Sequence, residues 1–248
     1  MASHFVSHGL THVGLVRRRN EDAFLDRPAP GPGLGLWAVA DGMGGHAQGD
    51  YASASIVAAL DAPGADWPPG ELGQFIEAAA GRLNAVDAEL RARASRLGPG
   101  AAIASTVVVL LAQAGEFAVL WAGDSRAYHW RNGEFRRLTV DHSHVQELVE
   151  AGLLRAEEAA FNPQSHVVTR AIGAGRLEFG LMRQALVAGD RFLLCSDGLT
   201  NMVGDCDIAR EIAAAPPRIA AERLLERVLA AGAVDNATIV VVAVEPAG

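Results

Sequence analysis

Four aspartates, far apart in the sequence, each stand beside an apolar run, and this pattern limits the fold more than any other feature. Apolar runs of this length predict buried β-strands. The four are Asp41 after residues 36–40, Asp124 after 117–122, Asp197 after 192–195, and Asp235 before 237–244. Because a buried carboxylate must be neutralised, paired or metal-bound, we expect these strand ends to converge on one site.

The segments between these aspartates predict an antiparallel meander rather than a doubly wound sheet. Strands are expected at 105–112, 116–122, 126–131 and 134–138 without intervening helices. Asn132-Gly133 predicts a type I′ turn in the last hairpin. Further strands are expected at 178–187, 190–195 and 237–244, and helices at 47–62, 71–97, 141–152, 207–214 and 218–231. Residues 27–35, rich in proline and glycine, and residues 156–175, which lack periodicity, predict loops.

The 248 residues contain no linker, repeat or low-complexity segment, so we expect a single domain over residues 1–248. The 50% hydrophobic content is sufficient for a large core. No apolar run reaches transmembrane length, and residues 1–22 lack the apolar centre of a signal peptide. These features predict a soluble, cytoplasmic protein.

The composition of the chain, and the motifs that its sequence lacks, exclude several classes of function. The net charge of −8 argues against nucleic acid as a ligand, because such binding needs clustered cations. The sequence contains no lysine, which excludes a Schiff-base lysine and a P-loop. Neither Cys195 nor Cys206 is followed by the arginine of a cysteine phosphatase, and no Gly-x-Ser-x-Gly or zinc-type Cys/His cluster occurs. Metal-assisted hydrolysis is the chemistry that remains.

Sites made of carboxylates suit Mg²⁺ or Mn²⁺ rather than zinc. Two such ions that share a carboxylate can polarise a phosphoryl oxygen and hold a bridging hydroxide for in-line attack. Arg17, with Glu21 and Asp22 shortly after it, is either a solvated charged turn or an arginine placed beside the carboxylates near Asp41.

Seven motifs, in order along nearly the whole chain, resemble those of the metal-dependent PP2C (PPM) family of serine/threonine protein phosphatases in its short bacterial form. They are Arg17-x-x-Asn20-Glu21-Asp22, Val39–His46, Gly123–Arg126, Leu138–Ser143, Thr169–Gly173, Ser196–Leu199 and Asp235–Thr238. The resemblance implies an α+β fold, a four-layer αββα sandwich of two stacked antiparallel sheets flanked by helix pairs, with a flap at about 142–175.

The resemblance also implies roles for individual residues. Asp41 would bridge two tightly bound Mn²⁺ or Mg²⁺ ions, Gly42 would lend its carbonyl, and Asp197 and Asp235 would complete the first ion's shell. Glu21 and Asp22 would act through water. Asp124, with Asp197, would hold a weaker third ion. Arg17 would grip the substrate phosphate and His46 would be the general acid.

The function implied is hydrolysis of phosphoserine and phosphothreonine in proteins by the metal-bridging hydroxide. The expected partners are phosphoprotein substrates and a bacterial Ser/Thr kinase that the enzyme opposes, and we expect a monomer that binds neither nucleic acid nor membrane. Two alternatives stay open: a catalytically idle module that binds phosphoproteins, and a phosphatase of small phosphorylated metabolites. Asp124 as a turn residue and His46 as a structural histidine are the corresponding alternatives within the site.

Overall fold

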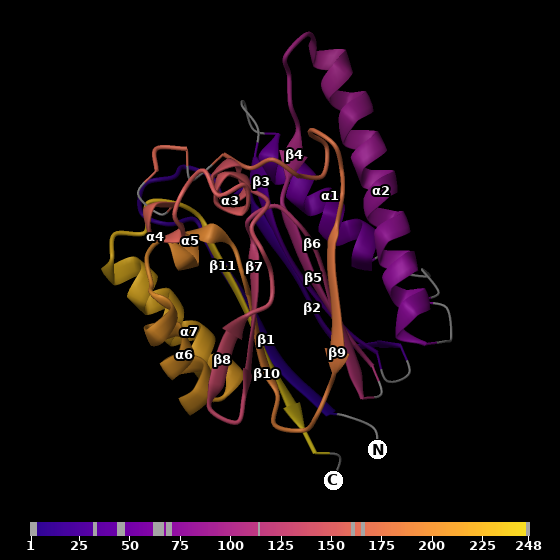
Figure 1. Cartoon of the computed structure of the whole chain (residues 1–248). Helices are drawn as coiled ribbons and strands as arrows, with labels where there is room; N and C mark the ends of the chain where they lie inside the picture. Colours follow the sequence, from indigo (N-terminus) through magenta and orange to yellow (C-terminus); the bar gives the residue numbers. More distant parts are fainter. Residues whose placement is uncertain are drawn as a thin grey trace.

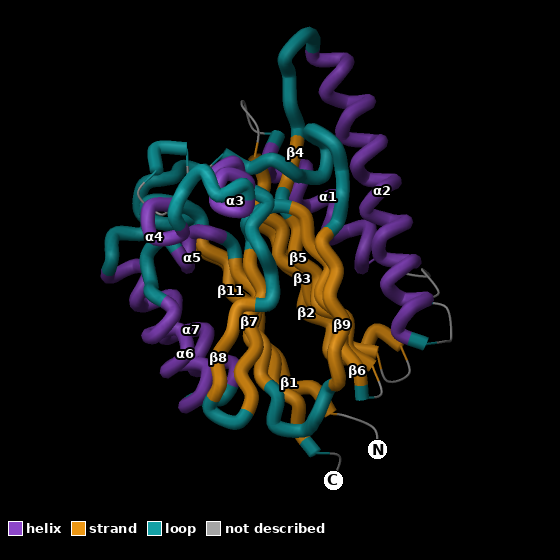
Figure 2. Tube along the Cα trace, viewed as in Figure 1, coloured by secondary structure: helices purple, strands orange, loops and turns teal. Residues whose placement is uncertain are grey.

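Two antiparallel β-sheets stack face to face, and helices cover their outer faces (Figures 1 and 2). The computed structural model describes residues 4–31, 34–43, 48–61, 67, 71–113, 115–159, 162–164 and 167–246. The expected sandwich of two antiparallel sheets with helix pairs outside them is confirmed.

The first sheet joins the two ends of the described chain. Its strands lie in the order β1 (His4–His12), β11 (Ala237–Glu245), β10 (Arg191–Cys195), β7 (Arg126–Arg131) and β8 (Glu134–Arg137). β1 pairs with β11 along its whole length, from His4 opposite Glu245 to His12 opposite Ala237. The start of β11 therefore lies beside the end of β1.

The second sheet has the order β2 (Asp22–Gly31), β3 (Leu34–Met43), β5 (Val107–Gln113), β6 (Glu116–Ala122) and β9 (Gly180–Ala185), and β4 (Ala104–Ser105) pairs with the end of β3. The loop predicted at 27–35 is wrong, because β2 continues to Gly31. β2 is an edge strand whose register shifts between Arg27 and Gly31. Prolines, which lack an N–H, are tolerated at such edges and irregularities.

Both faces of the second sheet are buried, which explains why β3 is apolar without alternation. Leu36, Ala38 and Ala40 pack toward helices α1 (Gly49–Asp61) and α2 (Leu72–Leu97). Trp37 and Val39 pack in the opposite direction, against residues of the first sheet. Successive side chains of a strand point to opposite faces, so this one run serves two cores.

Helices α6 (Asp205–Ala214) and α7 (Pro217–Ala230) cover the outer face of the first sheet. Pro217 occupies the first turn of α7, where its missing N–H costs no helical hydrogen bond. α3 (His144–Glu150), α4 (Ala156–Ala159) and α5 (Asp197–Thr200) are short. α4 lies where only loop was predicted, and no helix was predicted at α5. The type I′ turn is confirmed by positive φ angles of 52° at Asn132 and 88° at Gly133.

The strand ends that carry the aspartates lie at the same end of the sandwich. Asp41, near the end of β3, pairs with Asp22 at the start of β2. The end of β6 lies beside the start of β5, where Ala122 pairs with Val107. In the first sheet, Cys195 at the end of β10 pairs with Ile239, near the start of β11. Antiparallel pairing thus places all four aspartates at the same end of the two stacked sheets.

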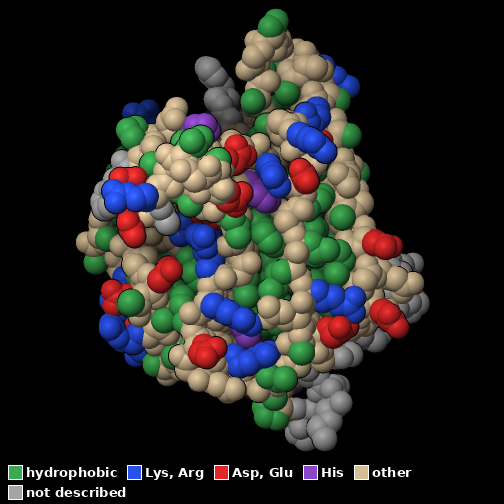
Figure 3. All heavy atoms as spheres, in the orientation of Figure 1, with side chains coloured by type: hydrophobic (Ala, Val, Ile, Leu, Met, Phe, Trp, Pro, Cys, Tyr) green, Lys and Arg blue, Asp and Glu red, His purple; other side chains and the backbone are tan. Residues whose placement is uncertain are grey.

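The surface carries charges of both signs. On the face shown in Figure 3, arginine side chains lie among aspartate and glutamate side chains. Among the described residues, no helix combines the length and apolar character needed to cross a membrane.

Candidate metal centre

Carboxylates from both sheets meet around a hollow of about 380 Å³. The second sheet contributes Asp41 from β3 and Asp124 from the turn after β6, while the first contributes Asp197 after β10 and Asp235 before β11. The other lining residues are Arg17, Glu21, Gly42, Met43, Val168 and Asn236. The convergence predicted from the strand ends is therefore present in the structure.

Hydrogen bonds to its backbone fix Asp41 at the mouth of the core. The Asp41 N–H donates to Thr106 Oγ1 over 3.2 Å, and the Asp41 carbonyl accepts from the Thr106 N–H over 2.9 Å. Ser105 Oγ donates to the same carbonyl over 3.0 Å. Because these contacts hold the main chain on both sides of the Cα atom, the Asp41 side chain is free to face the hollow.

Gly42 follows Asp41 at a point where no side chain fits. A Cβ atom on Gly42 would lie 2.1 Å from the Gly49 carbonyl oxygen and 2.5 Å from that of Glu21. The Gly42 N–H donates to the same Glu21 oxygen over 3.1 Å. Glycine is thus required by this close approach of three backbone segments. Gly42 also lines the hollow, where its carbonyl was predicted to bind a metal ion.

The environment of Asp41 is unfavourable to an unpaired negative charge. Burial is the main cause that raises the pKa of Asp41 well above its usual value, and the charges of the neighbouring aspartates add to the shift. Asp41 and Asp197 line the same hollow, and the charge of Asp197 is one of those that raise the pKa of Asp41. A cation between the two carboxylates would relieve this repulsion.

The same effects extend to the other acids of the hollow. Burial, followed by the charges of Asp197 and Asp141, raises the pKa of Asp124 to about 7. Burial and the charge of Asp235 raise the pKa of Asp197. A group of buried carboxylates whose charges repel one another is stabilised by cations in their midst.

Asp22 is buried beside the hollow and does not line it. Its carboxylate accepts hydrogen bonds from Ser196 Oγ over 2.8 Å and from Thr238 Oγ1 over 2.7 Å. Burial nevertheless raises the pKa of Asp22 to about 6. Glu21 lies on the lining itself, so the structure brings Glu21 into the hollow and places Asp22 one layer behind it. This placement is compatible with contact through water, as predicted for Asp22.

Arg17 reaches the hollow from the loop between β1 and β2. Its Nη2 atom lies 2.7 Å from Asp235 Oδ2, and its side chain is 55% exposed. This hydrogen bond is the main cause that raises the pKa of Arg17. The arginine predicted to hold the substrate phosphate is therefore anchored to an aspartate predicted to hold a metal ion, with its remaining donors accessible.

Asn236 organises this loop, a role that sequence reasoning missed. Its Oδ1 accepts from the Glu21 N–H over 2.9 Å, and its Nδ2 donates to the carbonyls of Val13 and Arg19 over 2.9 and 2.8 Å. One buried amide thus fixes both sides of the loop that carries Arg17. The only available signal was its position directly after Asp235 in the motif.

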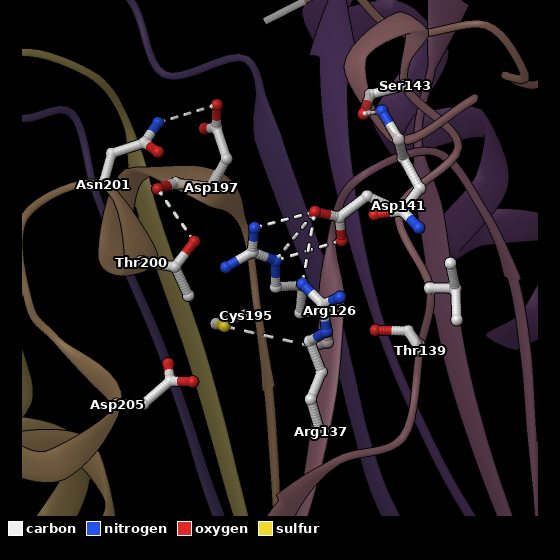
Figure 4. Close-up of polar contacts among 12 residues, drawn as sticks. Arg126, Arg137, Thr139, Asp141, Ser143, Cys195, Asp197, Thr200, Asn201 and Asp205 are labelled. Atoms are coloured by element: carbon white, nitrogen blue, oxygen red, sulfur yellow. Dashed lines mark hydrogen bonds and ion pairs between the residues drawn. The ribbon is translucent and has the colours of Figure 1, made fainter. Parts of the chain in front are cut away.

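Asp197 begins helix α5, and Asn201 Nδ2, one turn later, donates to its Oδ2 over 3.1 Å (Figure 4). Deeper in the same view, Arg126 makes three hydrogen bonds to the carboxylate of Asp141, the shortest being 2.7 Å. Both residues belong to the quoted motifs, but their pairing was not predicted. The ion pair joins the start of β7 to the beginning of the predicted flap.

Mg²⁺ or Mn²⁺ fits this donor set. The lining supplies carboxylate oxygens, one predicted backbone carbonyl and room for water, which are the ligands that these ions prefer. Within the described residues, no group of three His, Cys, Asp or Glu side chains already has the arrangement of a ready-made ion site. The fit therefore rests on the donor chemistry and on the mutual repulsion of the buried acids. His46, the predicted general acid, lies outside the described residues.

Comparison with known proteins adds a family and two relatives. A family model described as protein phosphatase 2C matches residues 16–231. The serine/threonine protein phosphatase PstP of Mycobacterium tuberculosis is 38% identical over 229 residues, which cover 92% of this chain and 43% of that protein. The chain thus spans less than half the length of that relative. The protein phosphatase PhpP of Streptococcus pneumoniae is 34% identical over 241 residues, covering 94% of this chain and 95% of that protein.

A solved structure supports the same likeness in three dimensions. The catalytic domain of the serine/threonine protein phosphatase PstP, in complex with two manganese ions, superimposes with a TM-score of 0.82 at 33% identity. The match covers 98% of this chain and 99% of that one. It therefore includes both sheets and the acidic hollow between their ends.

Proposed function

The chain belongs to the protein phosphatase 2C family, and on that basis we propose that it hydrolyses phosphoserine and phosphothreonine in proteins with Mn²⁺ or Mg²⁺ as cofactor. The observation that carries this proposal is the convergence of Asp41, Asp124, Asp197 and Asp235 on one hollow that Arg17 also lines. The names of the relatives, and the two manganese ions in one solved structure, support the same activity.

Some residues of the hollow are proposed to bind the metal ions, and Arg17 is proposed to bind the phosphate. Bound divalent ions supply positive charge to the phosphoryl oxygens and lower the pKa of water enough to provide a nucleophile at neutral pH. We propose that two ions would share Asp41, and that Gly42, Asp197 and Asp235 would hold the first of them. Glu21 and Asp22 contribute through water, and Asp124 with Asp197 forms a third, weaker site.

Arg17 orients the substrate. Its guanidinium presents several N–H donors in a planar fork that matches the oxygens of a phosphate. One donor is occupied by Asp235, which leaves others to point at the phosphoryl group. Because a fixed donor is more effective than one ordered on binding, the pairing with Asp235 prepares Arg17 for the transition state. His46 is proposed to give the leaving oxygen its proton.

In the cell, we place the protein in the cytoplasm as a monomer that opposes a bacterial Ser/Thr kinase and shares the substrates of that kinase. Family membership, and the name of one relative as a serine/threonine protein phosphatase, support the role of opposing such a kinase.

The experiment is a phosphatase assay on a phosphothreonine peptide, on 4-nitrophenyl phosphate and on a small phosphorylated metabolite, with Mn²⁺ or with excess EDTA. We expect turnover of the peptide with Mn²⁺ and none with EDTA. Full activity in EDTA would refute the metal-dependent mechanism. Binding of phosphopeptide without turnover would favour the idle binding module, and turnover of the metabolite alone would favour a metabolic phosphatase.

A further inference from the structure

Three large apolar side chains lie exposed together beside the hollow. Leu15 is 64% exposed and Val16 is 66% exposed on the loop between β1 and β2, and Val234 is 52% exposed on the segment that enters β11. The Leu15 N–H donates to the Ala233 carbonyl over 2.8 Å, which holds the two segments side by side. We call Leu15, Val16 and Val234 the apolar ledge. Single exposed apolar residues are ordinary, but a group at the rim of a site indicates binding.

The ledge adjoins the residues that define the hollow. Val16 is followed directly by Arg17, and Val234 is followed directly by Asp235. Arg17 and Asp235 pair with each other and line the hollow. An extended peptide advances about 3.3 Å per residue. A peptide whose phosphorylated side chain enters the hollow can therefore place a residue about one to three positions away against the ledge.

The ledge is built on a fixed backbone. Gly14 has a φ of 80°, and a Cβ atom there would lie 2.3 Å from the Asp235 carbonyl oxygen and 2.7 Å from that of Ala233. Ala233 has a φ of 34°, which is unusual for a residue with a side chain. Asn236 holds the Val13 and Arg19 carbonyls on either side of the ledge. The apolar side chains are thus presented to solvent by a loop that is tied down at both ends.

Charge indicates what the ledge accepts. Arg18 and Arg19 are exposed next to it, and neither side chain forms a hydrogen bond or ion pair with the described part of the chain. The chain as a whole carries a net charge of −8, whereas the consecutive arginines make this part of the surface locally positive. A partner with negative charge near an apolar group complements this surface.

We propose that the apolar ledge, with Arg18 and Arg19, binds the protein chain that flanks the phosphorylated residue of the substrate. The preferred segment carries an apolar side chain within three residues of the phosphoserine or phosphothreonine and an acidic side chain nearby. This inference rests on the proposed phosphatase function and adds the class of sequence that the enzyme accepts.

The test compares phosphothreonine peptides that differ only in the flanking residues: one set has Leu or Val, one has Ser, and one has Asp or Glu. The variant is Leu15→Ser combined with Val16→Ser, which keeps the backbone bond of Leu15 to Ala233. The matched control is Leu97→Ser, at the end of α2, where the leucine is 57% exposed. 4-Nitrophenyl phosphate has no flanking chain and serves as the second control.

We expect the wild-type enzyme to prefer the apolar-flanked peptide about tenfold in kcat/KM, through KM, because burying part of one aliphatic side chain has about that effect. The double variant should lose this preference while its turnover of 4-nitrophenyl phosphate stays within twofold, and Leu97→Ser should behave as wild type. Binding of the same peptides with a nonhydrolysable phosphonate, followed by fluorescence anisotropy, should show the same pattern. Arg18→Ser with Arg19→Ser should reduce the preference for acidic flanks and its dependence on salt.

Equal kcat/KM for apolar and serine flanks in the wild type would overturn the inference while leaving the phosphatase function intact. An equal loss on 4-nitrophenyl phosphate, or the same loss in Leu97→Ser, would also overturn it. Absence of Mn²⁺-dependent turnover of every phosphopeptide by the wild type would instead refute the proposed function itself.

Discussion

Replacing Asn236 by alanine tests whether one buried amide holds the loop that presents Arg17. Asn236 is 6% exposed, and its side chain makes three hydrogen bonds of 2.8 to 2.9 Å to backbone groups of Glu21, Val13 and Arg19. All three lie on the loop between β1 and β2 or at its ends. Alanine removes every one of these bonds and leaves the backbone groups to find other partners.

The expected loss of stability follows from the number of bonds. An intramolecular hydrogen bond contributes about 1 kcal/mol net, so three of them give a loss of about 3 kcal/mol. For a chain of this size, each 1 kcal/mol shifts Tm by roughly 2 to 4 °C, so Tm should fall by roughly 6 to 12 °C. Asn236→Asp keeps the acceptor for Glu21 but loses both donors and buries a carboxylate against the Val13 and Arg19 carbonyls, so it should lose at least about 2 kcal/mol.

The assay is thermal unfolding in EDTA, which separates the loop from any contribution of bound metal. Asn162→Ala is the matched control, because Asn162 makes one exposed hydrogen bond, to the Gln164 N–H, over 2.9 Å; its loss should be within about 0.5 kcal/mol. With Mn²⁺, Asn236→Ala should also lower kcat/KM on 4-nitrophenyl phosphate by at least roughly tenfold, because Arg17 is no longer held in position. A fall in Tm no larger than that of the control would refute the reasoning.

Four further predictions concern the site and its scaffold. Asp41→Asn, Asp197→Asn and Asp235→Asn should each lower kcat by at least roughly 10²-fold, as expected for loss of one preorganised electrostatic stabiliser. Near-wild-type turnover by any of these variants with Mn²⁺ would remove that residue from the assignment. Asp124→Ala should lower turnover and leave tight Mn²⁺ binding in place, so calorimetry that shows loss of the tight sites would contradict its assignment to a weaker ion. His46→Ala should slow a phosphothreonine peptide by about 10² to 10⁴-fold and 4-nitrophenyl phosphate far less, since nitrophenolate leaves without a proton; equal slowing would mean that the general acid is another group. Burial opposes the charge of Asp190, but the hydrogen bonds from Arg131 and the nearby His129 ring, whose Nε2 lies 3.1 Å from Asp190 Oδ1, outweigh it and lower its pKa to about 2 from about 3.8. This carboxylate therefore stabilises the fold by about 2 kcal/mol above pH 4, and the contribution disappears as the pH falls through 2. Urea denaturation should show Asp190→Asn less stable than wild type at pH 7 by that amount, with a smaller difference at pH 3; a constant difference would contradict the assigned pKa.

The sequence was sufficient to predict most of the strands, because hydrophobic burial sets their pattern directly, whereas the stacking of the two sheets was implied by the family resemblance. β3 is apolar at every position from Leu36 to Ala40 since a core lies on each side of it. β6 was located at its observed bounds, and the Asn132-Gly133 turn has the conformation that only such residues adopt readily. The convergence of the aspartates could be inferred for the same reason, because antiparallel strands bring alternate ends to one edge.

What could not be predicted depends on contacts between distant segments. The extension of β2 to Gly31 depends on its edge position, which the sequence does not state. α5 spans four residues, too few for a periodic pattern, and begins at an aspartate that sequence reasoning treated only as a strand end. The roles of Asn236 and of the Arg126–Asp141 pair arise from hydrogen bonds across 215 and 15 positions of sequence, respectively, which no local pattern encodes.

The contact between Arg17 and Asp235 links the residue proposed to bind the phosphate with a residue proposed to bind a metal ion. Asp235 Oδ2 accepts from Arg17, and Oδ1 accepts from the Asn236 N–H over 2.8 Å. A carboxylate has about four lone-pair positions, so both bonds leave Asp235 able to ligate an ion as proposed. In the proposed site, the same aspartate would set the distance between the ion and the guanidinium that orients the phosphate. Because Asn236 fixes the loop carrying Arg17 and directly follows Asp235 in the chain, one short segment would position both the phosphate and the ion. A displacement of that segment would disturb both binding sites at once. We therefore expect stability and kcat/KM to fall together in Asn236→Ala.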